Sequence, residues 1–376
     1  MKQSARAGTV RGIAVDIHWS VLLIVALFAW ELAEYQLPTH PGHPDAADWV
    51  AAVVGAIVLL LSLLAHEMAH ALVARRDGIQ TRSITLFVFG GVTQLEGEAD
   101  NPKADFRIAA VGPATSAALA GLFRGAEAIA GVATGHSLAV ATLAWLWEVN
   151  LLLAGFNLIP AAPLDGGRIL RAALWRHWGD RSRAAVAAAR SGRYFGLALV
   201  VLGVLGLFYV GITALWAALI GFFLYSGAVA EEQVARLQGA LVGLTVRQVM
   251  TPDPPAVRGS ATLVAVLAMF EWRLRTGTLV VTDAAGTPTG VLTGQAVRKP
   301  SAEQRQEMTA DQAAIPIALL PTARADEPAR VLVARMLSHD GRPALVFDGA
   351  GRLVGVVDFH DLERAASYAI GGSIEG

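Results

Sequence analysis

The chain has 376 residues, of which 54% are hydrophobic and only 16% are charged, and its mean hydropathy is +0.49. These values lie outside the range of ordinary soluble domains and indicate a membrane protein. A formal net charge of −1 gives no electrostatic case for binding nucleic acid, and the lack of cysteine excludes disulfides and thiolate metal ligands.

Long apolar segments lie almost entirely before residue 230, and the rest of the chain has the composition of a soluble domain. Segments of about twenty apolar residues predict transmembrane helices. We expect about six of them, at residues 13–32, 49–73, 106–129, 138–158, 194–210 and 212–230.

Basic residues predict the orientation of these helices. Lys and Arg precede the first span and lie between the second and third and between the fourth and fifth, whereas residues 34–48 and 131–137 carry none. We therefore expect a bacterial plasma-membrane protein in which both termini, and the soluble tail with them, are cytoplasmic.

The second predicted span contains an H-E-x-x-H motif formed by His66, Glu67 and His70. Histidines four residues apart share one face of a helix and can bind one zinc ion, and the glutamate beside them can accept a proton from a water at the metal. A site at this depth implies a substrate bond that also lies in the membrane. Because histidines on a helix face can also be core residues, the zinc hypothesis requires a third ligand.

Residues 83–89 are rich in β-branched and aromatic side chains and are followed by Gly90 and Gly91, which predicts a strand or a reentrant hairpin. Peptide cleavage requires an extended substrate, and an exposed strand edge beside the metal could hold one by strand addition. We expect the substrate to align along residues 85–89. The alternative is a hairpin that only packs against the helices.

Asp165, just after the fourth span, is the candidate third ligand, because a carboxylate beside an apolar segment is costly unless it is paired or bound to metal. Asn157 lies eight residues earlier and could donate a hydrogen bond to a developing oxyanion. Alternatively, Asp165 could cap a helix over residues 166–178. Helix-breaking residues that allow an irregular cavity wall surround it, namely Pro160, Pro163, Gly166 and Gly167.

The tail contains an internal repeat with an offset of 65 residues. In each copy an amphipathic stretch precedes a predicted hairpin, which indicates two βαββα units, at residues 240–300 and 310–368, after a membrane domain at 1–235. The repeated positions are Asp283, Gly286 and Gly290 in the first copy, and Asp348, Gly351 and Gly355 in the second.

The H-E-x-x-H motif, together with Asn157 and the run from Pro163 to Gly167, resembles the site-2 proteases, which are intramembrane zinc metalloproteases. More narrowly, the chain is similar to the bacterial branch with a C-terminal pair of CBS domains. The likeness extends through residues 89–91, residues 110–116 and the tail. It implies one Zn²⁺ per chain, held by His66, His70 and Asp165, with Glu67 as catalytic base, and substrate positioning by Asn157, Pro163, Phe89, Gly90 and Gly91.

The resemblance also implies a fold and a function. The expected fold is a membrane α-helical bundle with a reentrant β-hairpin, followed by a cytoplasmic α+β tandem CBS domain that could form a homodimer. The implied reaction is cleavage of a single-span membrane protein, such as an anti-sigma factor or a membrane-held regulator, in regulated intramembrane proteolysis. The alternative is a CBS-regulated transporter or channel, because intramembrane His and Asp can line ion paths. Glu67 between the two histidines favours hydrolysis.

CBS pairs often bind adenine nucleotides, and the usual signature has a hydroxyl residue that meets phosphate and an aspartate three residues later that meets ribose. The first repeat has Thr293 but Ala296, and the second has Asp361 but Asp358 in place of the hydroxyl. Asp358 would repel phosphate. We therefore expect weak or no adenine-nucleotide binding, and a docking or dimerisation role fits at least as well.

Overall fold

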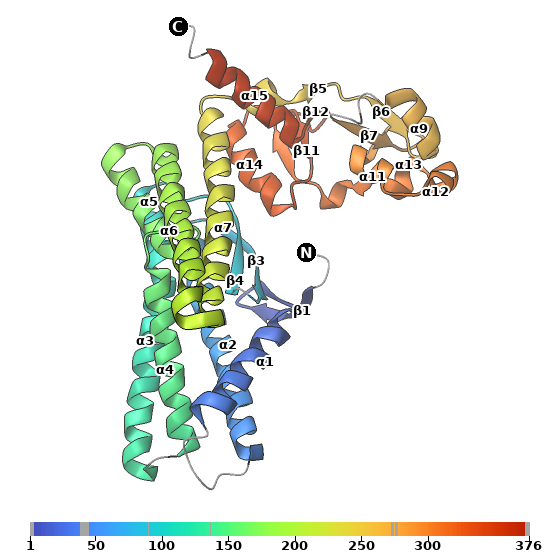
Figure 1. Cartoon of the computed structure of the whole chain (residues 1–376). Coiled ribbons are helices and arrows are strands. Elements are labelled where there is room, and N and C mark those ends of the chain that lie inside the picture. Colours follow the sequence, from blue (N-terminus) through green and yellow to red (C-terminus); the bar gives the residue numbers. More distant parts are fainter. Residues whose placement is uncertain are drawn as a thin grey trace. The chain divides into compact units, whose positions relative to one another are not determined.

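A computed structural model describes residues 4–37, 45–88, 90–135, 137–271, 274 and 277–372. Contacts divide the chain into two compact units, residues 1–233 and 234–376. The first unit combines long apolar helices with one four-stranded sheet (Figure 1). Its α-helices are α1 (Val21–Glu31), α2 (Asp45–Arg76), α3 (Pro102–Thr134), α4 (Leu138–Asn157), α5 (Asp165–Trp178), α6 (Arg181–Val210) and the larger part of α7 (Leu215–Ala240).

Four helical segments in the described residues are long and apolar enough to cross a membrane. The last of them is a hairpin in which the 3₁₀ turn Gly211–Ala214 joins α6 to α7. The expected membrane helical bundle is therefore confirmed. The segments are Ala46–Arg76, Pro102–Thr134, Leu138–Asn157 and Arg181–Ala240.

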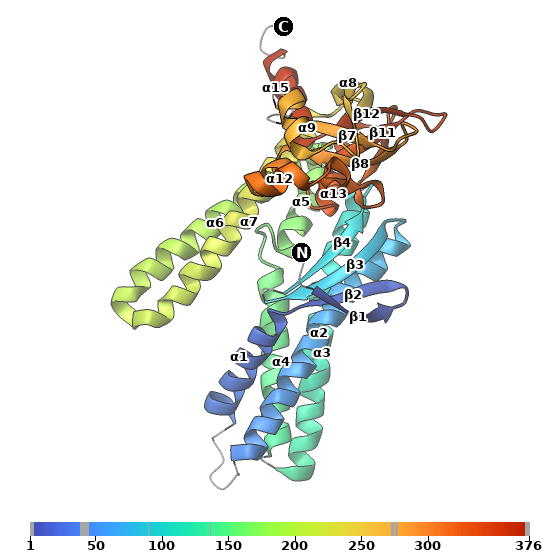
Figure 2. The same ribbon diagram turned by 90° about the vertical axis from the view of Figure 1, so that its right-hand side faces the viewer.

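The sheet of the first unit has the order β1-β2-β3-β4 and lies beside the C-terminal half of α2 (Figure 2). Its core joins Ile13 and Ile84 to Met68 of α2. Strands β2 and β3 are parallel, and the other two pairs are antiparallel. The bounds are β1 (Ser4–Val10), β2 (Ile13–His18), β3 (Gln80–Phe87) and β4 (Gly90–Glu96).

The first predicted span requires a correction, because residues 13–18 form β2 and not the start of a helix. Ile13, Val15 and Ile17 alternate with less apolar residues, and this period of two is that of a strand with one face packed on a core. The following α1 has 11 residues, or about 16 Å, which is shorter than the roughly 30 Å hydrocarbon core. A π-helical turn, Leu32–Gln36, follows it.

The predicted hairpin is present, but its strands differ from the expectation in two ways. Gly90 and Gly91 do not break the strand, because they begin β4, and Phe89 lies outside the described residues. β3 is paired on both sides, with β2 and with β4. A substrate therefore cannot align along residues 85 and 86 of β3, contrary to our expectation, since the backbone groups there already have partners. The outer edge of β4 pairs with no other described strand.

The second unit contains two sheets, and each includes one short outer strand that belongs by sequence to the other repeat. The first sheet has the order β6-β7-β8-β9 and the second β10-β11-β12-β5. Gly290 of β8 pairs with Pro316 of β9, and Gly355 of β12 pairs with Pro252 of β5. The strands are β5 (Thr251–Pro252), β6 (Ala256–Arg258), β7 (Thr278–Thr282), β8 (Pro288–Thr293), β9 (Ile315–Pro316), β10 (Thr322–Arg324), β11 (Ala344–Phe347) and β12 (Leu353–Val357).

Short helices complete both repeats of this unit. They are α8 (Val246–Val249), α9 (Leu263–Phe270), α11 (Gly294–Arg298), α12 (Ala302–Glu307), α13 (Ala310–Ala313), the 3₁₀ turn Ile317–Leu319, α14 (Ala329–Ser338) and α15 (Phe359–Gly372). The expected α+β repeat is confirmed.

The residues that recur in the sequence shape the hairpin of each repeat. The Oδ1 atoms of Asp283 and Asp348 each accept hydrogen bonds from the backbone N–H groups two and four residues later. Gly286 and Gly351 have φ values of +86° and +77°, which favour glycine. The offset of 65 residues therefore reflects a repeated turn geometry.

Candidate zinc site

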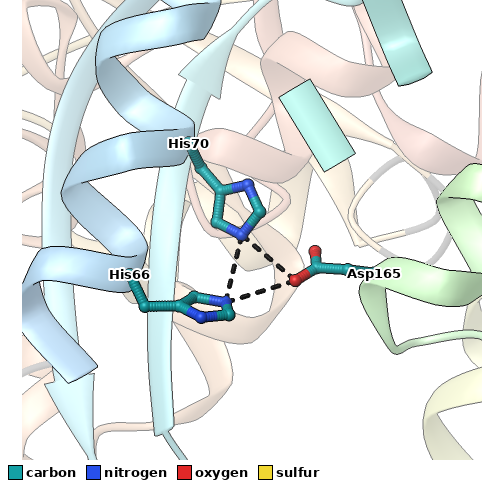
Figure 3. A group of neighbouring side chains, drawn as sticks. All are labelled: His66, His70 and Asp165. Carbon is teal, nitrogen blue, oxygen red and sulfur yellow. Dashed lines mark hydrogen bonds and ion pairs between the residues drawn. The ribbon is translucent and has the colours of Figure 1, made fainter. Parts of the chain in front are cut away.

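Helix α2 and the first residue of α5 together form a cluster of three potential metal ligands (Figure 3). His66 and His70 are buried, with 3% and 5% of their surface exposed. Asp165 Oδ2 lies 3.2 Å from His66 Nε2 and 3.1 Å from His70 Nε2, and the two Nε2 atoms are 3.2 Å apart. The structure thus brings together the three residues predicted as ligands, although Asp165 lies 99 residues from His66.

The chemistry of these atoms calls for a cation between them. The Ile108 carbonyl can only accept a hydrogen bond, so His70 Nδ1, at 2.6 Å, carries a proton. The Nε2 of a neutral His70 ring then presents a lone pair to a carboxylate oxygen, which is unfavourable without a shared cation. Zinc bonds of about 2.0–2.1 Å at tetrahedral angles place ligand atoms about 3.3 Å apart, close to the separations found here. The donor set therefore fits zinc.

Asp165 begins α5 without capping it. Its helix has Leu164 as the N-cap, with no side-chain capping bond, and the carboxylate faces the histidines. An ionised Asp165 carboxylate in this position would offer its Oδ2 atom to the same cation as the two Nε2 atoms.

Helix α3 orients both histidine rings through residues whose roles the sequence did not reveal. Ser116 Oγ lies 2.9 Å from His66 Nδ1, and the Ile108 carbonyl accepts from His70. A Cβ added to Gly112 would lie 2.1 Å from His70 Nε2, so the site has no room for a side chain there. Gly112 and Ser116 are small residues four apart, a signal for close helix packing. Nothing in the sequence showed that this face meets the histidines.

Strand β4 covers the carboxylate of the predicted base. Thr93 Oγ1 donates to Glu67 Oε2 over 2.8 Å, and a Cβ added to Gly91 would lie 2.4 Å from Glu67 Cγ. Gly91 and Thr93 are two residues apart in the strand, so they lie on one face of it. Thr93 is a further site residue that the sequence did not indicate.

The other predicted positioning residues lie at different places. Asn157 ends α4, and its amide donates to the Leu153 carbonyl of its own helix over 3.0 Å. Pro163 lies two residues before Asp165, where a Cβ added to Gly227 of α7 would be 3.0 Å from the Pro163 ring. Ser191 of α6 also donates to the Pro160 carbonyl over 2.6 Å. The α6–α7 hairpin thus contacts the loop that leads to Asp165.

Sequence comparisons identify the family of the chain. The model of peptidase family M50 matches residues 54–132 and 124–203, and the CBS domain model matches residues 246–300 and 316–368. The chain is 42% identical over 369 residues to a Mycobacterium tuberculosis protein named zinc metalloprotease Rip3, covering 97% of this chain and 93% of that one. The chain belongs to peptidase family M50, the site-2 proteases.

Other relatives of this site-2 protease are more distant. The zinc metalloprotease MJ0392 of Methanocaldococcus jannaschii is 28% identical over 256 residues, which cover 68% of each chain. The solved structure of a site-2 protease from the same organism is 26% identical, with a TM-score of 0.44 over 61% of this chain and 95% of that chain.

Family membership gives the general activity. This site-2 protease is a zinc metalloprotease with membrane helices and a tandem CBS tail. Membership of this family supports hydrolysis over the alternative of a transporter or channel. It also implies that the metal held by His66, His70 and Asp165 would be zinc.

Proposed function

We propose that this site-2 protease cleaves a peptide bond within or near the transmembrane segment of a single-span membrane protein, as a step of regulated intramembrane proteolysis. The observation that carries the proposal is the position of His66, Glu67 and His70 on Ala46–Arg76, a helix that contains an 18-residue stretch of mean hydropathy 2.3. A hydrolytic group on an apolar span acts on chains that can enter that apolar region. An anti-sigma factor or a membrane-held transcription regulator is the expected class of substrate.

The residues around the site support this chemistry. When bound, zinc would act as a Lewis acid and lower the pKa of a water molecule. Glu67 is the proposed base: Thr93 holds its Oε2 atom, which sets the orientation of the carboxylate, and its Oε1 atom can accept a proton from the attacking water. Asn157 and Pro163 remain proposed positioning residues.

The open edge of β4 is the proposed place for the unwound substrate. A helical substrate hides its carbonyls in its own hydrogen bonds, so the segment to be cut must first become extended. Strand addition supplies main-chain partners without requiring a particular sequence. β4 has one edge without a described partner strand, and its residues Gly91 and Thr93 contact Glu67. A segment paired there would lie beside the proposed base.

We further propose that both termini and the CBS tail are cytoplasmic in a bacterial plasma membrane. Arg75 and Arg76 lie in the last turn of α2, and α5 with the start of α6 is also rich in arginine, as cytoplasmic ends of membrane helices are. His70 lies five residues before Arg75, or about 7–8 Å along the helix. The metal would then lie near the cytoplasmic side.

For the CBS pair we propose a docking or dimerisation role without strong nucleotide binding. Asp361 is only 5% exposed, and its carboxylate already accepts hydrogen bonds from Thr251 Oγ1 at 3.0 Å and Arg364 at 2.5 Å. Thr293 Oγ1 accepts from the Ala296 N–H as the cap of α11. Calorimetric titration of the chain with ATP tests this, and a micromolar affinity would contradict it.

The proposed activity can be tested by proteomics of membrane stubs in cells that express the wild-type chain or Glu67→Gln. A matched control is Glu127→Gln, which removes a carboxylate of α3 that pairs with Arg124. We expect truncated single-span proteins to accumulate with Glu67→Gln alone. Identical stubs with all three chains would overturn the proposal.

A further inference from the structure

A buried ion pair joins α3 to the helix that carries Asp165. Asp105 of α3 is 1% exposed and receives two parallel hydrogen bonds from Arg171 of α5. Arg171 Nε lies 2.9 Å from Asp105 Oδ2, and Arg171 Nη2 lies 2.7 Å from Oδ1. This two-pronged geometry restricts both the distance and the rotation of the two helices, and lysine cannot reproduce it.

Asp105 lies on the face of α3 that also contacts the two histidines of α2. Residues 105, 108, 112 and 116 follow the spacing of one helix face. Ile108 and Ser116 bond to the histidine rings, and Gly112 packs against them. Asp105 lies one turn before Ile108. The same face therefore holds the two α2 ligands directly and the helix of the third ligand through Asp105.

On α5, Arg171 lies six residues after Asp165, or about 9 Å along the axis. The start of α5 is fixed separately, because a Cβ on Gly166 would lie 2.2 Å from the Ile159 carbonyl oxygen. Helix α5 also packs against α3 and α6. The ion pair at Arg171, near which Arg168 Nη2 lies 3.7 Å from Asp105 Oδ1, adds a directional contact further along the axis. The axis determines where the Asp165 carboxylate points.

We propose that Asp105 and Arg171 are positioning residues for the zinc ligand Asp165. A buried ion pair gives little net stability compared with apolar side chains of similar size, so a structural role alone accounts poorly for one here. What the pair supplies is a single orientation of α5, in which Asp165 Oδ2 is almost equidistant from the two Nε2 atoms. The inference rests on the assignment of His66, His70 and Asp165 as zinc ligands.

The test uses the full-length protein in detergent. The variants are Arg171→Met, Arg171→Lys and Asp105→Asn, and the control is Arg107→Met, which removes an exposed α3 arginine that pairs with Asp77. Three measurements are made: the zinc Kd by competition with a chelator, the visible spectrum of the Co²⁺-substituted protein, and thermal unfolding of the zinc-free protein. Asp165→Ala provides the reference for loss of the ligand.

We expect Arg171→Met to weaken zinc binding about tenfold or more, as loss of residues that orient ligands does. Arg171→Lys and Asp105→Asn should fall between it and the wild type, with altered cobalt spectra, and Arg107→Met should match the wild type. If Arg171→Met does not fold, the two milder variants decide. Wild-type zinc affinity and cobalt spectra in both would overturn the inference. Unchanged zinc affinity in Asp165→Ala would instead show that the ligand assignment is wrong.

Discussion

Gly91 of β4 lies so close to Glu67 of α2 that a Cβ on the glycine would be 2.4 Å from Glu67 Cγ and 2.7 Å from Cδ. Two residues later, Thr93 donates a hydrogen bond to the same carboxylate. The strand proposed to hold the substrate and the residue proposed as base are therefore one packed unit. A small displacement of either changes the geometry between them.

Gly91→Ala should reduce proteolysis while zinc stays bound. The added methyl must displace the Glu67 side chain or β4, and a misplacement of about 1 Å at a catalytic group can cost on the order of a hundredfold in rate. We expect a loss of kcat of about tenfold or more with unchanged zinc content. The control is Gly8→Ala in β1, where nothing lies within 4 Å of the added Cβ. Full activity of Gly91→Ala would show that the strand adapts freely.

Gly112→Ala should instead remove the metal. Its Cβ would lie 2.1 Å from His70 Nε2 and 2.6 Å from His66 Nε2, where the zinc ligands must converge. Metal analysis of the purified protein should find zinc largely absent. Gly121→Ala, on the same helix with nothing within 4 Å, should keep its zinc. Equal zinc in both variants would place the metal elsewhere.

His66→Ala and Glu67→Gln should separate binding from catalysis. The first variant loses a ligand, and zinc occupancy should fall sharply. The second loses only the base and should keep zinc and fold while proteolysis is abolished. Elemental analysis and cleavage of a reconstituted single-span substrate measure both effects. Substantial cleavage by Glu67→Gln would exclude it as the base.

Proline substitutions should reveal the substrate-binding edge of β4. Neighbouring residues of a strand direct their N–H groups to opposite edges, so Val92→Pro and Thr93→Pro have different consequences. One should disrupt pairing with β3 and lower the melting temperature, and the other should leave the fold and zinc intact while cleavage falls. Val92 and Gln94 direct their N–H groups to the same edge, so Gln94→Pro should repeat the result of Val92→Pro. This comparison is included because Thr93 also bonds to Glu67, so Thr93→Pro changes the contact with the base as well as the strand. If no fold-neutral proline reduces cleavage, the substrate is held elsewhere, and Asn157 is the next candidate.

Asp358→Ser should stabilise the CBS unit at neutral pH. Burial, and then the nearby charge of Asp361, raise the pKa of Asp358 in the folded state. Between the unfolded value near 4 and the raised folded value, the folded state binds more protons, so stability falls as pH rises through that window. Serine keeps an acceptor for the Asp361 N–H, which Asp358 Oδ1 accepts at 2.9 Å, and removes the charge.

Thermal unfolding across pH checks this prediction. The advantage of Asp358→Ser should be complete above the raised pKa and should shrink as pH falls toward about 4. Asp326→Ser is the control, because hydrogen bonds from its own backbone and from Arg324 lower the pKa of Asp326, so its loss should not stabilise the protein. A wild-type melting temperature for Asp358→Ser at neutral pH would contradict the repulsion assigned to Asp358 and Asp361.

The sequence by itself determined the features that depend on local spacing. Two histidines four residues apart share a helix face wherever that helix lies, and the 65-residue repeat predicts two similar units because each copy carries its own turn residues. Runs of apolar residues predicted the long membrane helices in the same way. Asp165 could be predicted as a ligand because a carboxylate beside a membrane span requires a partner.

Tertiary structure decided what depends on contacts between distant segments. Residues 13–18 form a strand because β3 and α2 offer a core for their alternate side chains, whereas hydropathy alone cannot separate that run from the helix after it. Because β3 is paired on both sides, the unpaired edge in the described sheet belongs to β4. The face of α3 that packs against α2 places Gly112 and Ser116 next to the histidines. The contacts of α3 and Asp165 with the two histidines join residues 38 to 99 positions apart, and only the packing of whole helices brings them together.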